Sequence, residues 1–217
     1  MRLILLGAPG AGKGTQCKRI TAEYHLPHLS SGDILRQERE QKSELGRKAQ
    51  EYMDSGALVP DELIVEMMAG AIEKTTQEGF VLDGFPRTVN QSEELDKYLK
   101  SSNKGIDVVI NLVIDDQVVL QRITGRRSCP MCGAVYHIEN LKPKVDGICD
   151  NDGAKLVQRP DDTEEVVMNR LKTYHEQTEP VAEYYRQHGN ICDIRADMDV
   201  DQVTDLIFGK LDAFQKA

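Results

Sequence analysis

Residues 2–15 read RLILLGAPGAGKGT, an apolar run followed directly by a glycine-rich segment that carries one lysine and one threonine. A buried strand, a tight glycine turn and a helix starting near Lys13 would leave several backbone N–H groups pointing into one concavity. Such a nest at a helix N-terminus binds phosphate, because the helix dipole and the unpaired donors both favour an anion. Glycine also lacks the Cβ atom that would block close approach. The stretch therefore predicts a phosphate-binding loop.

The spacing of this loop matches GxxxxGK, in which the lysine places a charge on the terminal phosphates and a nearby hydroxyl coordinates Mg²⁺. Lys13 occupies the lysine position, but Gly14 separates it from Thr15. The commoner pattern has Ser or Thr directly after the lysine. This departure directs the prediction to proteins that phosphorylate nucleotides.

Length and composition bound the class of protein. The chain has 217 residues, of which 40% are hydrophobic, which suits one domain with an insertion or two. Its net charge of -9 repels nucleic acid and anionic membranes, so any phosphate ligand must be held locally. The apolar run LILL is too short for a signal peptide or a spanning helix, so we expect a soluble, cytoplasmic protein. Five cysteines without a secretion signal favour metal binding or burial over a disulfide framework.

Short aliphatic runs alternate with helical patterns along the chain, which is typical of an α/β protein with a parallel sheet. The expected strands are 2–6, 28–30, 79–83, 108–114 and 191–194. The expected helices are 13–24, 33–39, 45–54, 61–74, 89–100, 117–124, 163–187 and 200–214. We divide the chain into a core of residues 1–29, 60–125 and 160–217, a helical insertion at 30–59 and a second insertion at 126–159.

The second insertion contains two knuckles of the same design, CPMCG at 129–133 and CDNDG at 149–153. Three thiolates and one carboxylate would surround Zn²⁺ with no open position, which is typical of a structural site. The predicted ligands are Cys129, Cys132, Cys149 and Asp152. His137 and Asp150 are alternatives for the fourth ligand; His137 is the better intrinsic zinc donor, but only Asp152 takes the symmetric position. An oxygen ligand leaves another divalent metal open, and free cysteines or a disulfide remain the alternative to any metal.

From these motifs the chain resembles an adenylate kinase of the bacterial long-lid form, over nearly its whole length. The matching segments are GAPGAGKGTQ at 7–16, LSSGDILR at 29–36, SGALVPDE at 55–62, GFVLDGFPRT at 79–88, TGRR at 124–127 and QRPDDTEEVVMNRL at 158–171. The resemblance implies a P-loop fold of five parallel strands, with an AMP-binding helical insertion and a mobile lid. It also implies the reaction ATP + AMP ⇌ 2 ADP with Mg²⁺, and a monomer.

Catalytic residues follow from the resemblance together with the chemistry of phosphoryl transfer, which needs cations converging on the transferred group. Arginine suits this task because its fork donates two parallel hydrogen bonds to phosphate. The expected catalytic residues are Lys13, Arg87, Arg122, Arg126, Arg159, Arg170 and Asp83. Asp83 ends an apolar strand and would order Mg²⁺ through water. No general base is expected, because the attacking AMP phosphate is already an anion.

Nucleotide contacts are likewise implied by the resemblance. ATP would contact Gly10, Ala11, Gly12, Lys13, Gly14, Thr15, Arg126, Val135, Tyr136 and the backbone of Met198. AMP would contact Ser31, Arg36, Ala57, Leu58, Val59, Gly84, Phe85, Pro86, Arg87, Gln91, Arg159 and Arg170. The Gln91 amide can pair with an adenine edge. Ser31 stands where threonine is commoner in the family, which keeps the hydroxyl.

Two other functions are weighed against this one. A kinase for another nucleoside monophosphate, such as UMP or CMP, would share the fold and the phosphate chemistry. A P-loop ATPase that grips nucleic acid through a zinc ribbon would need a basic, aromatic surface. Residues 126–159 hold six Lys or Arg and four Asp or Glu, a balance that disfavours nucleic acid as a partner.

Overall fold

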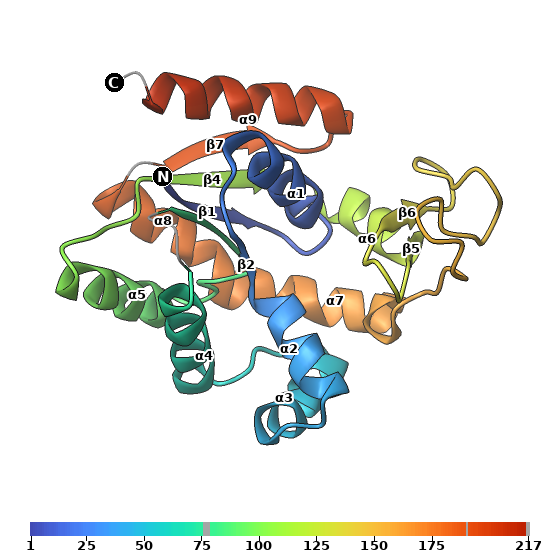
Figure 1. Ribbon diagram of the computed structural model, residues 1–217, viewed down its shortest axis with the longest axis horizontal. Helices are drawn as coiled ribbons and strands as arrows, with labels where there is room; N and C mark the ends of the chain where they lie inside the picture. Colours follow the sequence, from blue (N-terminus) through green and yellow to red (C-terminus); the bar gives the residue numbers. More distant parts are fainter. Residues whose placement is uncertain (76–78, 190, 216–217) are drawn as a thin grey trace.

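Five parallel strands form the central sheet of the computed structural model, which describes residues 1–75, 79–189 and 191–215 (Figure 1). Their spatial order is β2 (His28–Ser30), β3 (Phe80–Asp83), β1 (Arg2–Gly7), β4 (Val108–Val113) and β7 (Ile191–Arg195). Each strand begins and ends within one residue of its predicted position. The predicted parallel α/β sheet is therefore confirmed, with the glycine-rich loop leaving its central strand.

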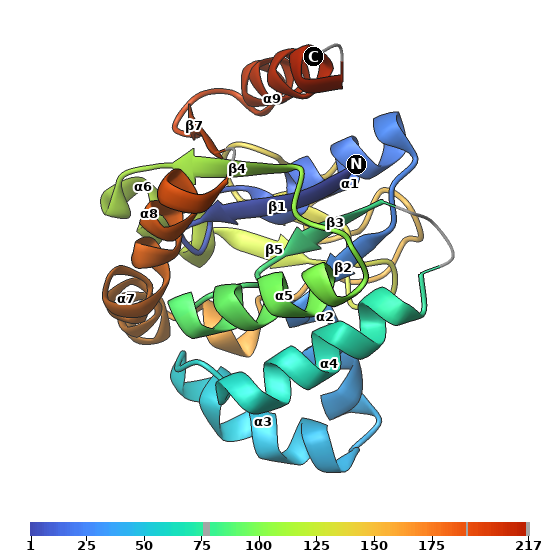
Figure 2. The same ribbon diagram turned by 90° about the vertical axis from the view of Figure 1, so that its left-hand side faces the viewer.

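Both faces of the sheet are covered, which explains why residues 3–6 of β1 are all apolar rather than alternating. Leu3 and Leu5 face α1 (Lys13–Tyr24) and α9 (Val200–Gln215), in a cluster that includes Cys17 and Ile207. Ile4 and Leu6 belong to the cluster on the opposite face, the face covered by α5 (Val89–Ser101) and α8 (Glu179–His188) in Figure 2. There they pack in the cluster formed with α4 (Asp61–Glu73), α5 and α8.

Side-chain caps explain where several helices begin. Ser30 accepts a hydrogen bond from the Asp33 N–H, so α2 runs from Ser31 to Glu40, two residues earlier than predicted. Thr88 caps α5 and Thr163 caps α7 (Glu164–Thr173) in the same way. The remaining helices are α3 (Glu44–Ser55) and α6 (Asp116–Thr124). A 3₁₀ turn, η1 (Pro160–Asp162), precedes α7.

The helical segment predicted at 163–187 is confirmed over 164–188, but it is not one regular α-helix. A π-helical turn, η2 (Tyr174–Thr178), separates α7 from α8. Pro180 lacks a backbone N–H and clashes with the preceding turn in a helix interior, but fits the first turn of a new helix, where the structure has it. Within η2, His175 bonds Glu179 through Nδ1 at 2.9 Å and Asp116 of α6 through Nε2 at 2.9 Å. These hydrogen bonds, Glu179 first, raise the pKa of His175.

The two insertions project from the core. The hairpin of α2 and α3 needs glycine at one position, because a Cβ on Gly46 would lie 2.2 Å from the Glu38 carbonyl oxygen. The second insertion forms an antiparallel pair, β5 (Arg126–Ser128) and β6 (Val135–His137). We call residues 126–159 the lid segment. Its small apolar cluster is Cys129, Tyr136, Cys149 and Leu156.

The division into a core and two insertions at 30–59 and 126–159 stays a prediction. The separate apolar cluster of the lid segment is consistent with it. The predicted core ranges include positions 76–78, 190 and 216–217, which lie outside the described residues.

Candidate active site

The glycine-rich loop joins β1 to α1 through two residues with left-handed backbone angles, Gly10 at φ 76° and Gly12 at φ 96°. At Gly10 a Cβ would lie 2.7 Å from Ile123 Cγ1. Both the angle and the contact therefore require glycine there. The first N–H groups of a helix have no intrahelical partner. Those at the start of α1, which run through Lys13, Gly14 and Thr15, are available for an anion.

Lys13 lies under this loop, where Nζ donates to the carbonyl oxygens of Gly7 at 2.7 Å and Ala8 at 2.8 Å. Burial lowers the pKa of Lys13 to about 8, and the carboxylate of Asp83 opposes this shift. The positive charges of Arg87 and Arg170 lower the pKa further. Lys13, Arg87 and Arg170 come from separate segments, and the positive charges of the two arginines act on Lys13 in a site shielded from water. An anion bound among them would relieve this repulsion.

Five of the predicted arginines, Arg36, Arg87, Arg126, Arg159 and Arg170, belong to the same network. Burial, then the charges of Arg126 and Arg36, lower the pKa of Arg159 to about 10. The pKa of Arg170 is also lowered to about 10, by burial and by the charges of Arg126 and Arg87, against the opposing charge of Asp161. These arginines come from α2, β5 and α7, from the turn after β3 and from the residue directly before η1. The structure therefore brings both insertions and the core to one cationic centre.

Carboxylates hold three of these arginines in place. Asp162, whose side chain is fully buried, accepts from Arg126 Nε at 2.8 Å and from Arg126 Nη2. Asp161 accepts from Arg170 Nη1 at 3.1 Å, and Asp33 accepts from Arg36 Nη2 at 2.5 Å. Sequence reasoning missed these acids. The two aspartates of QRPDD at 158–162, directly after Arg159, were the available signal.

Two further arginines bond neutral groups. Arg87 Nε donates to the Gly84 carbonyl at 2.7 Å, and Arg159 Nε donates to Ser128 Oγ at 3.0 Å. Both guanidinium groups have their pKa lowered by burial first. Neither has a carboxylate among these hydrogen-bond partners, so each keeps charge to offer a phosphate.

Arg122 of α6 lies to one side, next to another predicted contact. Its Nη1 donates to the Ala196 carbonyl at 2.7 Å, and its Nη2 donates to the Met198 carbonyl at 3.4 Å. Burial lowers the pKa of Arg122, and the charge of Asp197 opposes it. The structure thus links two residues that sequence reasoning named separately, since Arg122 fixes the backbone of Met198.

Several residues predicted to contact AMP lie at the turn after β3. Ser31 Oγ donates to the Gly84 carbonyl at 2.6 Å, beside the cis peptide bond between Phe85 and Pro86. Ala57, Leu58 and Val59 form the link from α3 to α4, with Ala57 exposed and Val59 buried.

Gln91, predicted to contact AMP, is buried and bonds protein groups at the same turn. Its side chain is 1% exposed, and both ends of its amide are engaged. Oε1 accepts from the Arg87 N–H at 2.7 Å, while Nε2 donates to Asp61 Oδ1 at 2.6 Å. Each end of the amide keeps one further hydrogen-bonding position, because the nitrogen can donate twice and the oxygen can accept twice. In this arrangement Gln91 holds the backbone of Arg87.

Asp83 ends β3 at the carboxyl edge of the sheet, where ligands bind in parallel α/β proteins. It is 8% exposed, lies 3.7 Å from the position of a Cβ on Gly14, and bonds His28 Nε2 through Oδ2 at 3.2 Å. His28 belongs to none of the motifs found in the sequence, and sequence reasoning missed it.

The two knuckles of the lid segment meet in space. One ligand atom from each of Cys129, Cys132, Cys149 and Asp152 lies within 4.8 Å of the other three. Cys132 Sγ is 3.6 Å from Cys149 Sγ, and Cys129 Sγ is 3.2 Å from Asp152 Oδ2. The Ala154 N–H, followed by the neighbouring thiols, lowers the pKa of Asp152 to about 2. This group could hold a metal ion.

The alternative fourth ligands are engaged elsewhere. His137 Nδ1 accepts from the Glu139 and Asn140 N–H groups, and its Nε2 contacts the Gln121 carbonyl at 3.2 Å. Asp150 Oδ1 accepts from the Lys144 N–H at 2.9 Å. The geometry therefore favours Asp152.

The lid segment also reaches α1. Lys18 Nζ donates to the carbonyl of Gly133, in the first knuckle, at 3.1 Å. The predicted ATP contacts Val135 and Tyr136 lie in β6, with Val135 half-buried and Tyr136 8% exposed. The Tyr136 hydroxyl accepts from the Asp150 N–H at 2.8 Å, so this side chain is part of the knuckle fold.

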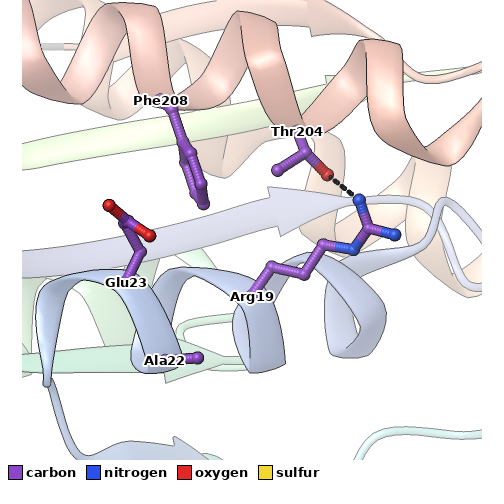
Figure 3. Close-up of a pocket in the computed structure, with 5 residues that line it drawn as sticks. All are labelled: Arg19, Ala22, Glu23, Thr204 and Phe208. Atoms are coloured by element: carbon purple, nitrogen blue, oxygen red, sulfur yellow. Dashed lines mark hydrogen bonds between the residues drawn. The ribbon is translucent and has the colours of Figure 1, made fainter.

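A hollow between α1 and α9 is a separate concavity, lined by Arg19, Ala22, Glu23, Thr204 and Phe208 (Figure 3). Arg19 Nη1 donates to Thr204 Oγ1 at 2.8 Å and pairs with a carboxylate of α9. Because Arg19 already bonds protein groups, this hollow is a weaker candidate for binding an anion than the cationic centre at the phosphate-binding loop.

A phosphate-binding loop on a parallel sheet lies close to several buried arginines. This combination defines a P-loop enzyme of phosphoryl transfer. Residues 5–190 match the family model described as adenylate kinase. The chain is 48% identical over 212 residues to the adenylate kinase of Acetivibrio thermocellus, covering 97% of this chain and 98% of the relative. It is 49% identical over 204 residues to that of Lachnospira eligens, covering 94% and 96%. The chain belongs to the adenylate kinase family.

Membership of this family brings the activity with it. Adenylate kinases transfer a phosphoryl group from ATP to AMP, bind ATP, AMP and ADP, and need Mg²⁺ with ATP. It favours neither the kinase for another monophosphate nor the ATPase with a nucleic-acid ribbon. Among the described helices, none combines the length and apolar content needed to cross a membrane.

Proposed function

We propose that this chain carries out the reversible reaction ATP + AMP ⇌ 2 ADP at the cationic centre formed by Lys13, Arg87 and Arg170. The observation that carries the proposal is that Lys13, bonded beneath the phosphate-binding loop, lies close enough to Arg87 and Arg170 for their charges to lower its pKa, after burial as the first cause. Buried like charges in one place favour the binding of a highly charged anion. Two nucleotides that meet end to end at their phosphates would supply that anion.

ATP would lie on the α1 side of this centre. The N–H groups of Gly10, Ala11, Gly12, Lys13, Gly14 and Thr15 would hold its phosphates, with Arg122 and Arg126 pairing their oxygens. Val135, Tyr136 and the backbone of Met198 would contact the nucleoside. The link from Arg122 to the Met198 carbonyl supports treating these two residues as one unit.

AMP would lie on the α2 side. Ser31, Arg36, Gly84, Phe85, Pro86 and Arg87 would surround its phosphate, and Ala57, Leu58, Val59 and Gln91 would surround its nucleoside. Arg159 and Arg170 would reach the transferred group from the lid segment and α7. Bonds from Arg87 and Ser31 to the same Gly84 carbonyl support a shared phosphate-binding turn.

The chemistry needs alignment more than acid–base catalysis. The AMP phosphate is an anion and attacks the terminal phosphorus of ATP in line, while charge spreads over the equatorial oxygens. Lys13 and the arginines would stabilise that charge without reorganising, which is the main source of rate in such sites. Mg²⁺ enters with ATP, and Asp83 would orient its water ligands.

The four knuckle residues Cys129, Cys132, Cys149 and Asp152 would hold a structural Zn²⁺. Three thiolates and a carboxylate fill a tetrahedral shell, so this metal would take no part in the chemistry. The lid segment has a small apolar cluster, and a metal supplies the folding free energy that such a module lacks. We further propose that the chain acts as a monomer in the cytoplasm.

The test is an assay of the purified chain with Mg²⁺-ATP and, in turn, AMP, CMP, GMP and UMP, followed by separation of the nucleotides. ADP formed from AMP, with little reaction of the other acceptors, is the expected result. Lys13→Met should lower kcat by about 100-fold or more, since it removes a preorganised charge. Lys100→Met, which removes an exposed lysine of α5, is the matched control. Faster transfer to CMP or UMP would overturn the choice of substrate.

A further inference from the structure

Three side chains of metal-binding type meet beneath the phosphate-binding loop. They are Cys17 of α1, His28 of β2 and Asp83 of β3, and one ligand atom of each lies within 4.8 Å of the other two. His28 Nε2 and Asp83 Oδ2 are 3.2 Å apart. This triad shares no residue with the knuckles of the lid segment.

The fold explains why these residues meet. In the parallel pairing of β2 and β3, His28 lies opposite Val81 and Ser30 lies opposite Asp83. His28 and Asp83 therefore point to the same face of the sheet, on adjacent strands. Cys17 follows Lys13 by four residues, so both side chains lie on the face of α1 that covers those strands.

We infer that this triad is a binding site for a thiophilic divalent cation, with Zn²⁺ as its representative. The Cys17 thiolate, the His28 imidazole and the Asp83 carboxylate are three ligands of the kinds that Zn²⁺ prefers, and a water molecule would take the fourth position. Binding would release the Cys17 proton to solvent, and the two negative ligands would balance the charge of the ion. Mg²⁺ demands oxygen ligands, so it would not compete for this set.

The exposures allow an ion to enter from one side. Cys17 is fully buried, whereas the side chains of Asp83 and His28 are 11% and 22% exposed. The accessible groups are thus the carboxylate and the imidazole, and the thiol lies behind them. A site with three protein ligands and one open position suits an exchangeable ion better than a permanent one.

Occupation of the triad inhibits phosphoryl transfer, an expectation that rests on the proposed role of Asp83. The bound cation uses the carboxylate that would orient the water ligands of Mg²⁺. It also places positive charge near Lys13, whose pKa is already affected by Asp83. The chain would therefore lose activity when free zinc rises, while its lid metal stays bound.

The experiment uses the full chain with its lid metal loaded and zinc chloride as the probe. Zinc content after dialysis against buffered free zinc is measured alongside the rate of ADP formation from Mg²⁺-ATP and AMP. Cys17→Ala removes the thiol, and His28→Gln removes the imidazole but keeps a hydrogen-bond donor for Asp83. Cys192→Ala is the matched control, because Cys192 is a partly buried thiol of β7 outside both metal-binding groups.

We expect wild type and Cys192→Ala to bind one more zinc ion per chain than Cys17→Ala. Loss of a group that merely supports a metal ligand lowers affinity about 10- to 100-fold, so Cys17→Ala and His28→Gln should raise the half-inhibiting zinc concentration by at least about tenfold. Equal zinc content in wild type and Cys17→Ala overturns the site. An extra ion without loss of activity overturns the inhibition.

Failure of the proposed function would look different. In that case ADP would not form from Mg²⁺-ATP and AMP even before zinc is added, whereas the extra zinc ion of wild type would still be measurable. Inhibition of equal strength in wild type, Cys17→Ala and His28→Gln would mean that zinc acts elsewhere, on the nucleotide or on the lid segment.

Discussion

Replacing Asp162 by asparagine tests whether a buried carboxylate positions Arg126. The Asp162 side chain is fully buried, that of Arg126 is 18% exposed, and the two groups form a bidentate pair. Asparagine keeps the size and one acceptor oxygen but removes the compensating charge. Breaking a buried ion pair from one side costs about 3–5 kcal/mol. With one acceptor retained and Arg126 partly exposed, we expect a loss of about 3 kcal/mol in the free energy of unfolding.

For a chain of this size, 1 kcal/mol corresponds to about 2–4 °C in Tm, so Asp162→Asn should melt about 6–12 °C below wild type. Its kcat should fall about 10- to 100-fold, because Arg126 loses its orientation but keeps its charge. This is less than the 10³- to 10⁵-fold contribution of an arginine finger in phosphoryl transfer. Calorimetry and steady-state kinetics measure the two effects.

The matched control is Glu139→Gln, which removes the same charge from an exposed position of the lid segment. It should melt within about 1 °C of wild type, since surface substitutions change stability little. If Asp162→Asn also melts within about 2 °C and keeps its kcat, the reasoning about the buried pair is refuted. A lower Tm with unchanged kcat would mean that Asp162 stabilises the fold without positioning Arg126.

Three further predictions concern the lid metal, a histidine and two glycines. If the knuckle residues hold the proposed metal, treatment with a strong chelator should lower Tm in calorimetry before it abolishes transfer at low temperature; an unchanged Tm would contradict the proposal that a metal stabilises the lid segment. His175→Gln should lower stability most below about pH 6.5, the pKa of histidine in the unfolded chain, and least above the raised pKa of the folded state. The reason is that the imidazole pairs with two carboxylates only while it is protonated. Thermal melts across pH measure this, and a loss of stability independent of pH would refute it. Gly46→Ala should cost about 1–3 kcal/mol in denaturant unfolding, since its Cβ would lie 2.2 Å from the Glu38 carbonyl oxygen. Gly70→Ala, whose Cβ would meet no described atom within 4 Å, should instead gain up to about 1 kcal/mol, and equal losses in both variants would contradict the steric argument.

The sequence by itself determined the parallel sheet, the phosphate-binding loop and the two cysteine knuckles. Each depends on local spacing: apolar runs of strand length, glycines that free a helix N-terminus, and ligand pairs separated by two residues. Caps are also local, yet α2 begins two residues before its predicted start, because Ser30 caps it. Pro180 indicates an irregularity near η2, but the helical periodicity on both sides favoured a single helix. The strands β5 and β6 were not predicted, because the lid segment is interrupted by Gly, Pro and Asn residues and shows no run of strand length.

Only the tertiary structure decided which residues, far apart in sequence, form ion pairs or lie together as a group that could bind a ligand. The carboxylates of Asp161 and Asp162 hold arginines that sequence reasoning treated as free, and Gln91 uses its amide within the protein. Cys17, His28 and Asp83 belong to no common motif and meet because strand register and the facing helix direct their side chains to one point. Spacing along the chain records periodicity and turns, whereas these contacts depend on the register and packing of elements far apart in sequence.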